Sequence, residues 1–156
     1  MDDFDFLVGR NWHVRNRVRV ERLANCDEWT EFDARLLDVR KILGGLGNID
    51  RFSARRDGKP FEAVSLRLFN PSSGLWTIYW ADNVSATLTE QVTGRFVDGV
   101  GEFLGRETYR GQTVELRFRW TDVTERSPRW EQAYLDESTG EWETNWIMRF
   151  TELETR

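Results

Sequence analysis

Three polar residues occupy positions where the alternation of the chain otherwise places apolar side chains. Asn16 interrupts a series of Trp and Val, Gln132 separates a Trp from a Tyr, and Thr144 separates two Trp. The hydroxyl of that Tyr, Tyr134, adds a fourth polar group of the same phase. A buried polar group needs a hydrogen-bond partner or a ligand, so these four side chains are the candidate ligand-binding groups. The aromatic residues expected to frame them are Trp80, Trp120 and Trp146. Alternatively, the four polar groups bind one another or buried water.

Histidine and cysteine chemistry has little support in this chain. His13 is the only His, and its phase, shared with Arg15 and Arg17, predicts that it points outward. A single outward His argues against a Ser-His-Asp triad, a His-ligated zinc and a haem ligand. Cys26 is the only Cys and has no His close to it in the sequence, so we interpret it as a structural thiol. We therefore expect no metal and no cofactor.

A stripe of arginines follows one segment of the chain and consists of Arg15, Arg17, Arg19 and Arg22. Such a stripe could hold an anion or a nucleic-acid backbone, but we expect it to pair across strands with acids such as Glu115 or Glu143. The chain as a whole carries a formal net charge of −5. Nucleic acids and anionic membranes attract basic surfaces, so we expect neither as a partner.

These residues are expected to lie on β-strands, because turn signals recur about every dozen residues and the segments between them alternate with period two. The predicted strands cover residues 11–23, 28–36, 46–55, 61–70, 75–82, 89–97, 100–109, 113–123, 128–136 and 141–152. Residues 3–9 are predicted to form a short helix, with Phe4 and Leu7 or Val8 on one side. Residues 37–43 form either a second helical turn or an extension of the strand before them.

The alternation also predicts which side chains face inward. In residues 61–70, the apolar series contains Leu66 and the polar series contains Ser65 and Arg67. In residues 28–36, the series with Phe32 competes with the series that includes Glu31. We favour the first series; the second would make Glu31 a buried acid.

Ten sequential strands joined by tight hairpins, each with one apolar face, predict an all-β fold. We expect a closed antiparallel up-and-down barrel with a short N-terminal helix, because closure removes the exposed edges of a sheet. The whole chain, residues 1–156, is expected to form this single domain. A ten-strand barrel is wide enough for a ligand-sized cavity. A two-sheet sandwich is the structural alternative.

The expected compartment is the cytoplasm. One Cys excludes an intrachain disulfide, which is consistent with a reducing environment. The acidic N-terminus lacks the basic and apolar segments of a secretory signal, and no stretch is long and apolar enough to span a membrane.

Four segments resemble lipocalin-like barrels of the calycin superfamily. FDFLVGRNW, residues 4–12, is similar to the short helix and Gly-x-Trp opening of these barrels. LFNP through WTIYW, GRFVDGVG, and RWEQA through WETNW resemble one group of uncharacterised bacterial lipocalin-like domains. The resemblance implies a barrel with Trp12 near its closed end and carries no established activity. Nitrobindin-like calycins bind haem through a His near the C-terminal end; the last strands here contain none, so haem binding is not carried over.

Three functional hypotheses follow from this barrel. The first is binding of a small apolar or aromatic molecule, with aromatic walls and the four polar groups orienting its polar edge. The second is a cofactor-free isomerase or cyclase that acts on a small hydrophobic substrate in the same cavity, with Tyr134 or an inward carboxylate moving a proton. The third is a protein-interaction module that uses its outer face, for example as a homodimer.

Overall fold

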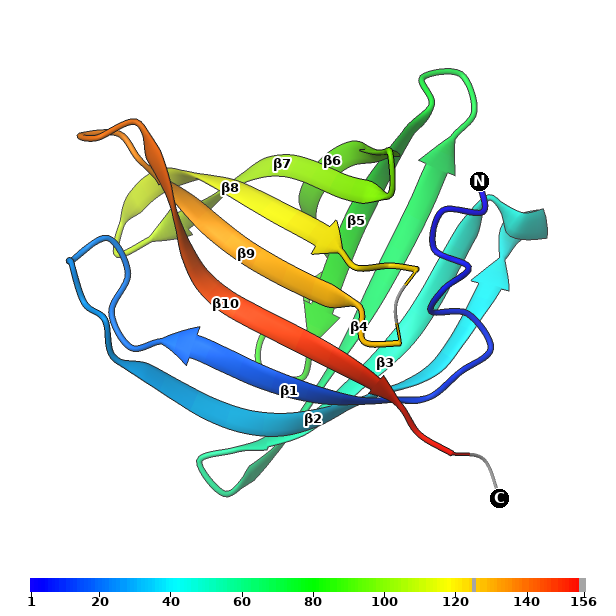
Figure 1. Cartoon of the computed structure of the whole chain (residues 1–156), viewed down its shortest axis with the longest axis horizontal. Helices are drawn as coiled ribbons and strands as arrows, with labels where there is room; N and C mark the ends of the chain where they lie inside the picture. The colour runs from blue at the N-terminus through cyan, green and yellow to red at the C-terminus, as the bar shows by residue number, and fades with distance from the viewer. Residues whose placement is uncertain (125, 155–156) are drawn as a thin grey trace.

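The computed structural model describes residues 1–124 and 126–154, and these form ten antiparallel strands closed into a barrel (Figure 1). The strands are β1 (Trp12–Arg19), β2 (Trp29–Ile42), β3 (Gly47–Arg56), β4 (Lys59–Asn70), β5 (Leu75–Asp82), β6 (Thr89–Val97), β7 (Val100–Tyr109), β8 (Gln112–Thr121), β9 (Arg129–Asp136) and β10 (Glu141–Glu152). Each strand pairs with its neighbours in sequence, and β1 closes the barrel against β10. The predicted up-and-down barrel is therefore confirmed, and the two-sheet sandwich is excluded.

Tight turns make this order of strands possible. Asp98 and Gly99 join β6 to β7 with φ angles of 51° and 79°, a pair of left-handed conformations that matches the twist of a two-residue hairpin. The longest strand, β2, continues to Ile42 before a short 3-10 turn over Leu43–Gly45. Residues 37–42 are therefore an extension of the preceding strand.

The N-terminal segment closes one end of the barrel. Residues 3–9 fold as consecutive turns, in which Leu7 N–H donates to the Phe4 carbonyl, rather than as the predicted helix. The prediction was right about the buried side of the segment, because Phe4 and Leu7 are almost fully buried. Trp12 donates its indole N–H to the Leu7 carbonyl at 3.2 Å, and Trp76 donates to Asp3 at 2.9 Å. These bonds fix the segment across the barrel end, where Figure 1 shows it in dark blue.

Outward ion pairs determine which side chains of β1 and β2 face the interior. His13 and Arg15 both contact Asp33 on the outer surface, and Arg15 also pairs with Glu31 at 2.8 Å. Hydrogen bonds from Arg15 and His13 hold the pKa of Asp33 below its ordinary value. Glu31 is therefore not a buried acid, and the favoured series with Phe32 faces inward.

The orientation of β4 differs from the sequence interpretation. Ser65 and Arg67 are buried on the inner face, whereas Leu66 lies on the outer face and is only partly covered. The register explains this result, because Ser65 lies opposite Asp50 and Ala63 opposite Phe52, and all four side chains are buried. The polar series of β4 thus belongs to the interior of the barrel.

Candidate functional site

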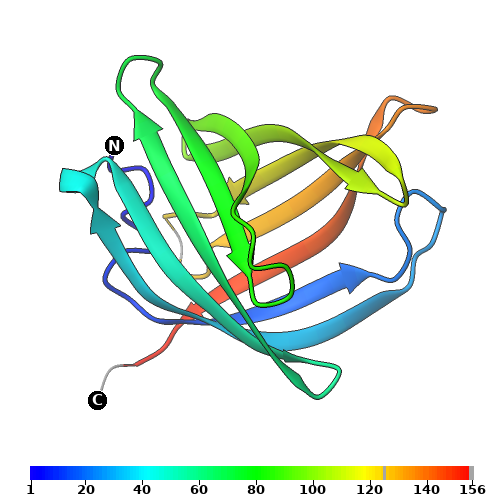
Figure 2. The same ribbon diagram turned by 180° about the vertical axis from the view of Figure 1, so that it is seen from behind.

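The barrel encloses a cavity of about 620 Å³. Six of the rings that line it are Phe52, Trp80, Phe118, Trp120, Trp130 and Trp146. The cavity extends away from the N-terminal segment towards the opposite end of the barrel, because Arg22, Val84 and Ser85 of the connecting loops also line it. Figure 2 shows the barrel from behind, with β4 and β5 in front of β8–β10.

Five of the seven predicted site residues line this cavity. They are Trp80, Trp120, Gln132, Tyr134 and Trp146. They come from β5, β8, β9 and β10, so closure of the barrel brings together residues that lie far apart in the sequence. The other two, Asn16 and Thr144, do not line the cavity.

Asn16 is completely buried behind the cavity wall. Its Oδ1 accepts the indole N–H of Trp146 at 3.0 Å, and its Nδ2 donates to the Val14 carbonyl at 3.2 Å. Both ends of the amide are therefore occupied by protein groups. Asn16 positions the Trp146 ring, which does line the cavity.

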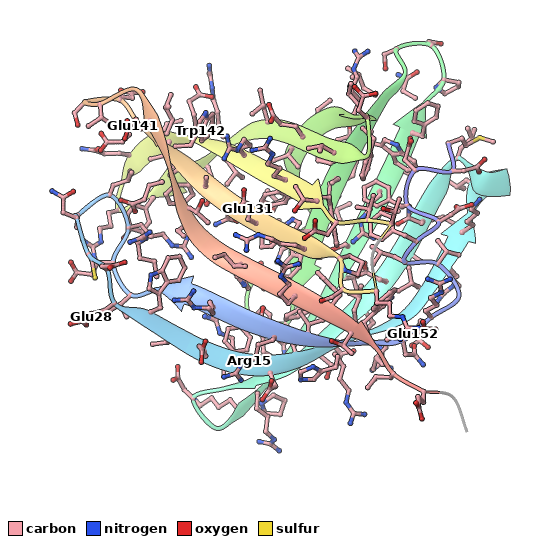
Figure 3. The ribbon with its side chains drawn as sticks, viewed as in Figure 1. Arg15, Glu28, Glu131, Glu141, Trp142 and Glu152 are labelled. Carbon is pink, nitrogen blue, oxygen red and sulfur yellow. The ribbon has the colours of Figure 1, made fainter. Side chains whose placement is uncertain are left out.

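Thr144 lies on the outer face because β10 contains a bulge. The register between β9 and β10 shifts between Thr144 and Trp146, which inserts Asn145 and reverses the alternation before it. Thr144 consequently lies opposite Ala133, in the row that contains Arg117 of β8. Trp142 shares this outer face (Figure 3). The Arg117 guanidinium lies 4.9 Å from the centroid of its ring.

The same bulge supplies a polar group that the alternation did not reveal. Asn145 is completely buried, and its Oδ1 accepts a hydrogen bond from Gln132 Nε2 at 2.8 Å. Gln132 is therefore held in a fixed position, from which its remaining hydrogen-bonding capacity is directed to the cavity. Only the pairing of β9 with β10 places Asn145 there, so its role is not visible in the sequence.

A chain of hydrogen bonds crosses the loop end of the cavity. Arg22 Nη1 donates to the Tyr134 hydroxyl at 2.7 Å, and that hydroxyl donates to Glu107. Burial, together with the Glu107 carboxylate, raises the pKa of Tyr134 above its ordinary value. Leu23 N–H donates to Glu143 at 2.8 Å, so the loop after β1 is attached to the barrel at two consecutive residues.

Arg56 covers part of the same end. Its guanidinium lies over the rings of Phe32, Phe61 and Trp146, with centroid distances of 5.2, 5.5 and 5.9 Å. Stacking of a cation on these rings is favourable and leaves the guanidinium N–H groups at the edge of the cavity. No alternation pattern singles out this residue.

The opposite end of the cavity, towards the N-terminal segment, contains a buried charged group. Arg67 Nη2 lies 2.7 Å from Asp50 Oδ2, and Arg67 Nη1 donates to Asn48 Oδ1 at 2.8 Å. The guanidinium also lies 5.1 Å from the centre of the Phe4 ring. Ser65 and Arg67 line the cavity, so we call this end, formed by Asn48, Asp50, Ser65 and Arg67, the cavity floor. The sequence contained a signal for it, because Ser65 and Arg67 share the phase of Phe61 and Phe69.

Within residues 1–124 and 126–154, no group of three or more His, Cys, Asp and Glu side chains is placed to hold a metal ion. No helix in this part of the chain is long and apolar enough to cross a membrane. A comparison with known protein families finds no match, and a comparison with curated proteins finds none either.

Proposed function

We propose that the protein binds a small, flat, largely apolar or aromatic molecule inside its barrel. The observation that carries the proposal is the cavity of about 620 Å³ with rings on its walls. Its volume falls within the range of small-molecule pockets, roughly 300–1,000 Å³. An interior packed only for stability has few voids larger than a water molecule, so a cavity of this size favours a role in ligand binding.

The walls and the polar groups have separate roles in this proposal. Trp80, Trp130 and Trp146 supply flat surfaces on which an aromatic ligand can stack or pack edge to face. Gln132 and Tyr134 orient its polar edge, and each is itself fixed by a hydrogen bond to the protein. Such preorganisation reduces the entropy lost on binding.

The contacts of Tyr134 favour binding over catalysis. Its proton is donated to Glu107 and its oxygen accepts from Arg22, so only one lone pair of the hydroxyl remains to accept a hydrogen bond from a ligand. Its raised pKa also makes the phenolate scarce at neutral pH. A cyclase or isomerase that used Tyr134 as a base would have to break both bonds first.

The test is a titration with aminoanthracene, a flat neutral fluorophore whose emission rises in apolar sites. Ile78 lines the cavity on β5, whereas Tyr79 next to it faces outward opposite Leu66. We expect Ile78→Trp to weaken binding at least about tenfold, or about 1.4 kcal/mol, because the larger side chain occupies ligand space. The matched Tyr79→Trp variant should bind as the wild type does. Equal affinity in all three proteins would place the probe outside the barrel and overturn the proposal.

A further inference from the structure

Arg67 is buried beside the cavity with much of its hydrogen-bonding capacity unused. Only 6 % of its side chain is exposed, and the guanidinium carries five N–H donors. Nη1 bonds to Asn48, and Nη2 makes an ionic contact with Asp50 that is not aligned as a hydrogen bond. Nε has no hydrogen-bond partner among the described residues and is covered by neighbouring atoms, so contact with the cavity is made by other atoms of the side chain. Buried donors of this kind require an explanation, because most find a partner.

Ser65 adds a second donor on the same side. It precedes Arg67 by two residues on β4, so both side chains point into the barrel and both line the cavity. Its backbone N–H is bonded to Asp50 at 3.3 Å, which fixes its position relative to the carboxylate. Its hydroxyl forms no hydrogen bond to another side chain or carbonyl of the described chain.

Stability alone does not account for this cluster. Removing two charges from water is costly, and well-packed apolar residues in place of a buried ion pair are often neutral or stabilising. Phe4 and Leu7 already close this end of the barrel with apolar side chains. Donors held rigidly against an otherwise aromatic cavity have a direct use in recognising an acceptor on a ligand.

The charge of the cluster selects the kind of acceptor. Asp50 is fully buried and already balances the charge of Arg67. A ligand carboxylate would add a second negative charge next to Asp50 in a medium of low dielectric, where like charges repel strongly. A neutral carbonyl oxygen accepts hydrogen bonds from Arg67 and Ser65 and adds no charge.

We propose that the ligand is a flat aromatic ketone or a related neutral carbonyl compound, which enters with its oxygen towards Arg67 and Ser65. This inference rests on the proposed function and assigns the cavity floor as its specificity site. The rings of the wall then surround the aromatic part of the ligand. A carboxylic acid of the same shape is the ligand that the floor rejects.

The test uses three naphthalenes substituted at the same ring carbon: acetylnaphthalene, isopropylnaphthalene and naphthoate. Each compound is titrated against bound aminoanthracene in the wild type, in Ser65→Ala and in the double variant Asp50→Leu/Arg67→Met. The double variant removes both charges together. Comparing ratios of Kd within each protein cancels the different hydrophobicities of the probes. We expect the preference for the ketone over the hydrocarbon to fall at least about tenfold in the double variant, the value of one hydrogen bond to a charged donor. In Ser65→Ala, which removes only a hydroxyl, it should fall by about threefold.

Asp50→Asn tests the argument from charge. This variant leaves Arg67 positive, so naphthoate should gain at least about tenfold relative to the ketone. Naphthoate binding to the wild type as tightly as the ketone would overturn the inference. An unchanged preference in both Ser65→Ala and the double variant would also overturn it. If aminoanthracene binds but no preference among the three probes exists, only the inference fails; if none of the four compounds binds, the proposed function fails as well.

Discussion

The indole N–H of Trp146 donates to Asn16 Oδ1 across 3.0 Å, and Asn16 is completely buried behind the ring. The two residues are separated by 130 positions in the chain, and the closure of β1 against β10 brings them together. One face of the cavity is therefore held by an amide that never meets the ligand. The contact links the stability of the barrel to the shape of the proposed site.

Asn16→Ala should destabilise the protein by about 2–3 kcal/mol, because it leaves the Trp146 N–H without its acceptor and opens a small void. Urea unfolding measures this change. In a double-mutant cycle with Trp146→Phe, the two losses should be less than additive, since the second substitution removes the group that the first leaves unpaired. Additive losses would mean that the hydrogen bond contributes nothing.

Tyr134 should make the protein less stable at high pH. Its pKa in the folded state lies above the ordinary value of 10.0 because of burial and the nearby Glu107. Above pH 10 the unfolded chain loses the proton that the folded protein keeps, so stability falls as pH rises. Tyr134→Phe removes this contribution, and its unfolding midpoint in urea should decline less steeply between about pH 9 and about pH 11. Parallel curves for the two proteins would contradict the assignment.

The ion pair at the cavity floor should show strong coupling. Arg67→Met alone leaves the Asp50 carboxylate buried without its partner, so we expect a loss of about 3–5 kcal/mol. Adding Asp50→Leu should recover most of that loss, because apolar side chains replace both charges. Thermal unfolding followed by circular dichroism compares the three proteins. A double variant less stable than Arg67→Met would show that the pair is needed for the fold itself.

Thr144 and Gln132 offer a test of the bulge in β10. Thr144 lies on the outer face, so Thr144→Ala should leave aminoanthracene binding unchanged. Gln132→Leu removes a polar group of the cavity and leaves buried Asn145 without its donor, which should lower stability by about 1–3 kcal/mol. Fluorescence titration and urea unfolding separate the two effects. Weaker probe binding in Thr144→Ala would mean that the strand keeps a simple alternation.

The barrel could be predicted from the sequence because turns and alternation are local properties. Residues 113–121 are the clearest case, since Leu116 and Phe118 face inward while Arg117 and Arg119 face outward, as expected. Asp-Gly pairs marked hairpins because both residues tolerate positive φ, which is again a local property. Five of the seven expected site residues line the cavity because their strands keep this alternation.

The features that could not be predicted from the sequence depend on the pairing between strands. The bulge at Asn145 shifts the register of β10 by one residue, which moves Thr144 to the other face. In β4 Val64, Leu66 and Leu68 lie on the outer face, while Arg67 faces inward because Asp50 and Asn48 of β3 pair with it. Alternation identifies two faces of a strand, but partners on a neighbouring strand decide which face is buried.

Native mass spectrometry of the protein incubated with aminoanthracene, with a denatured sample beside it, measures whether the barrel holds a ligand. We expect one added mass per chain that disappears on unfolding, is strongly reduced in Ile78→Trp and persists in Tyr79→Trp. A small molecule retained from the cell can also be present in the freshly purified protein and be displaced by the probe. Only the unliganded mass under all of these conditions, or an adduct as abundant in Ile78→Trp as in the wild type, would contradict binding inside the barrel.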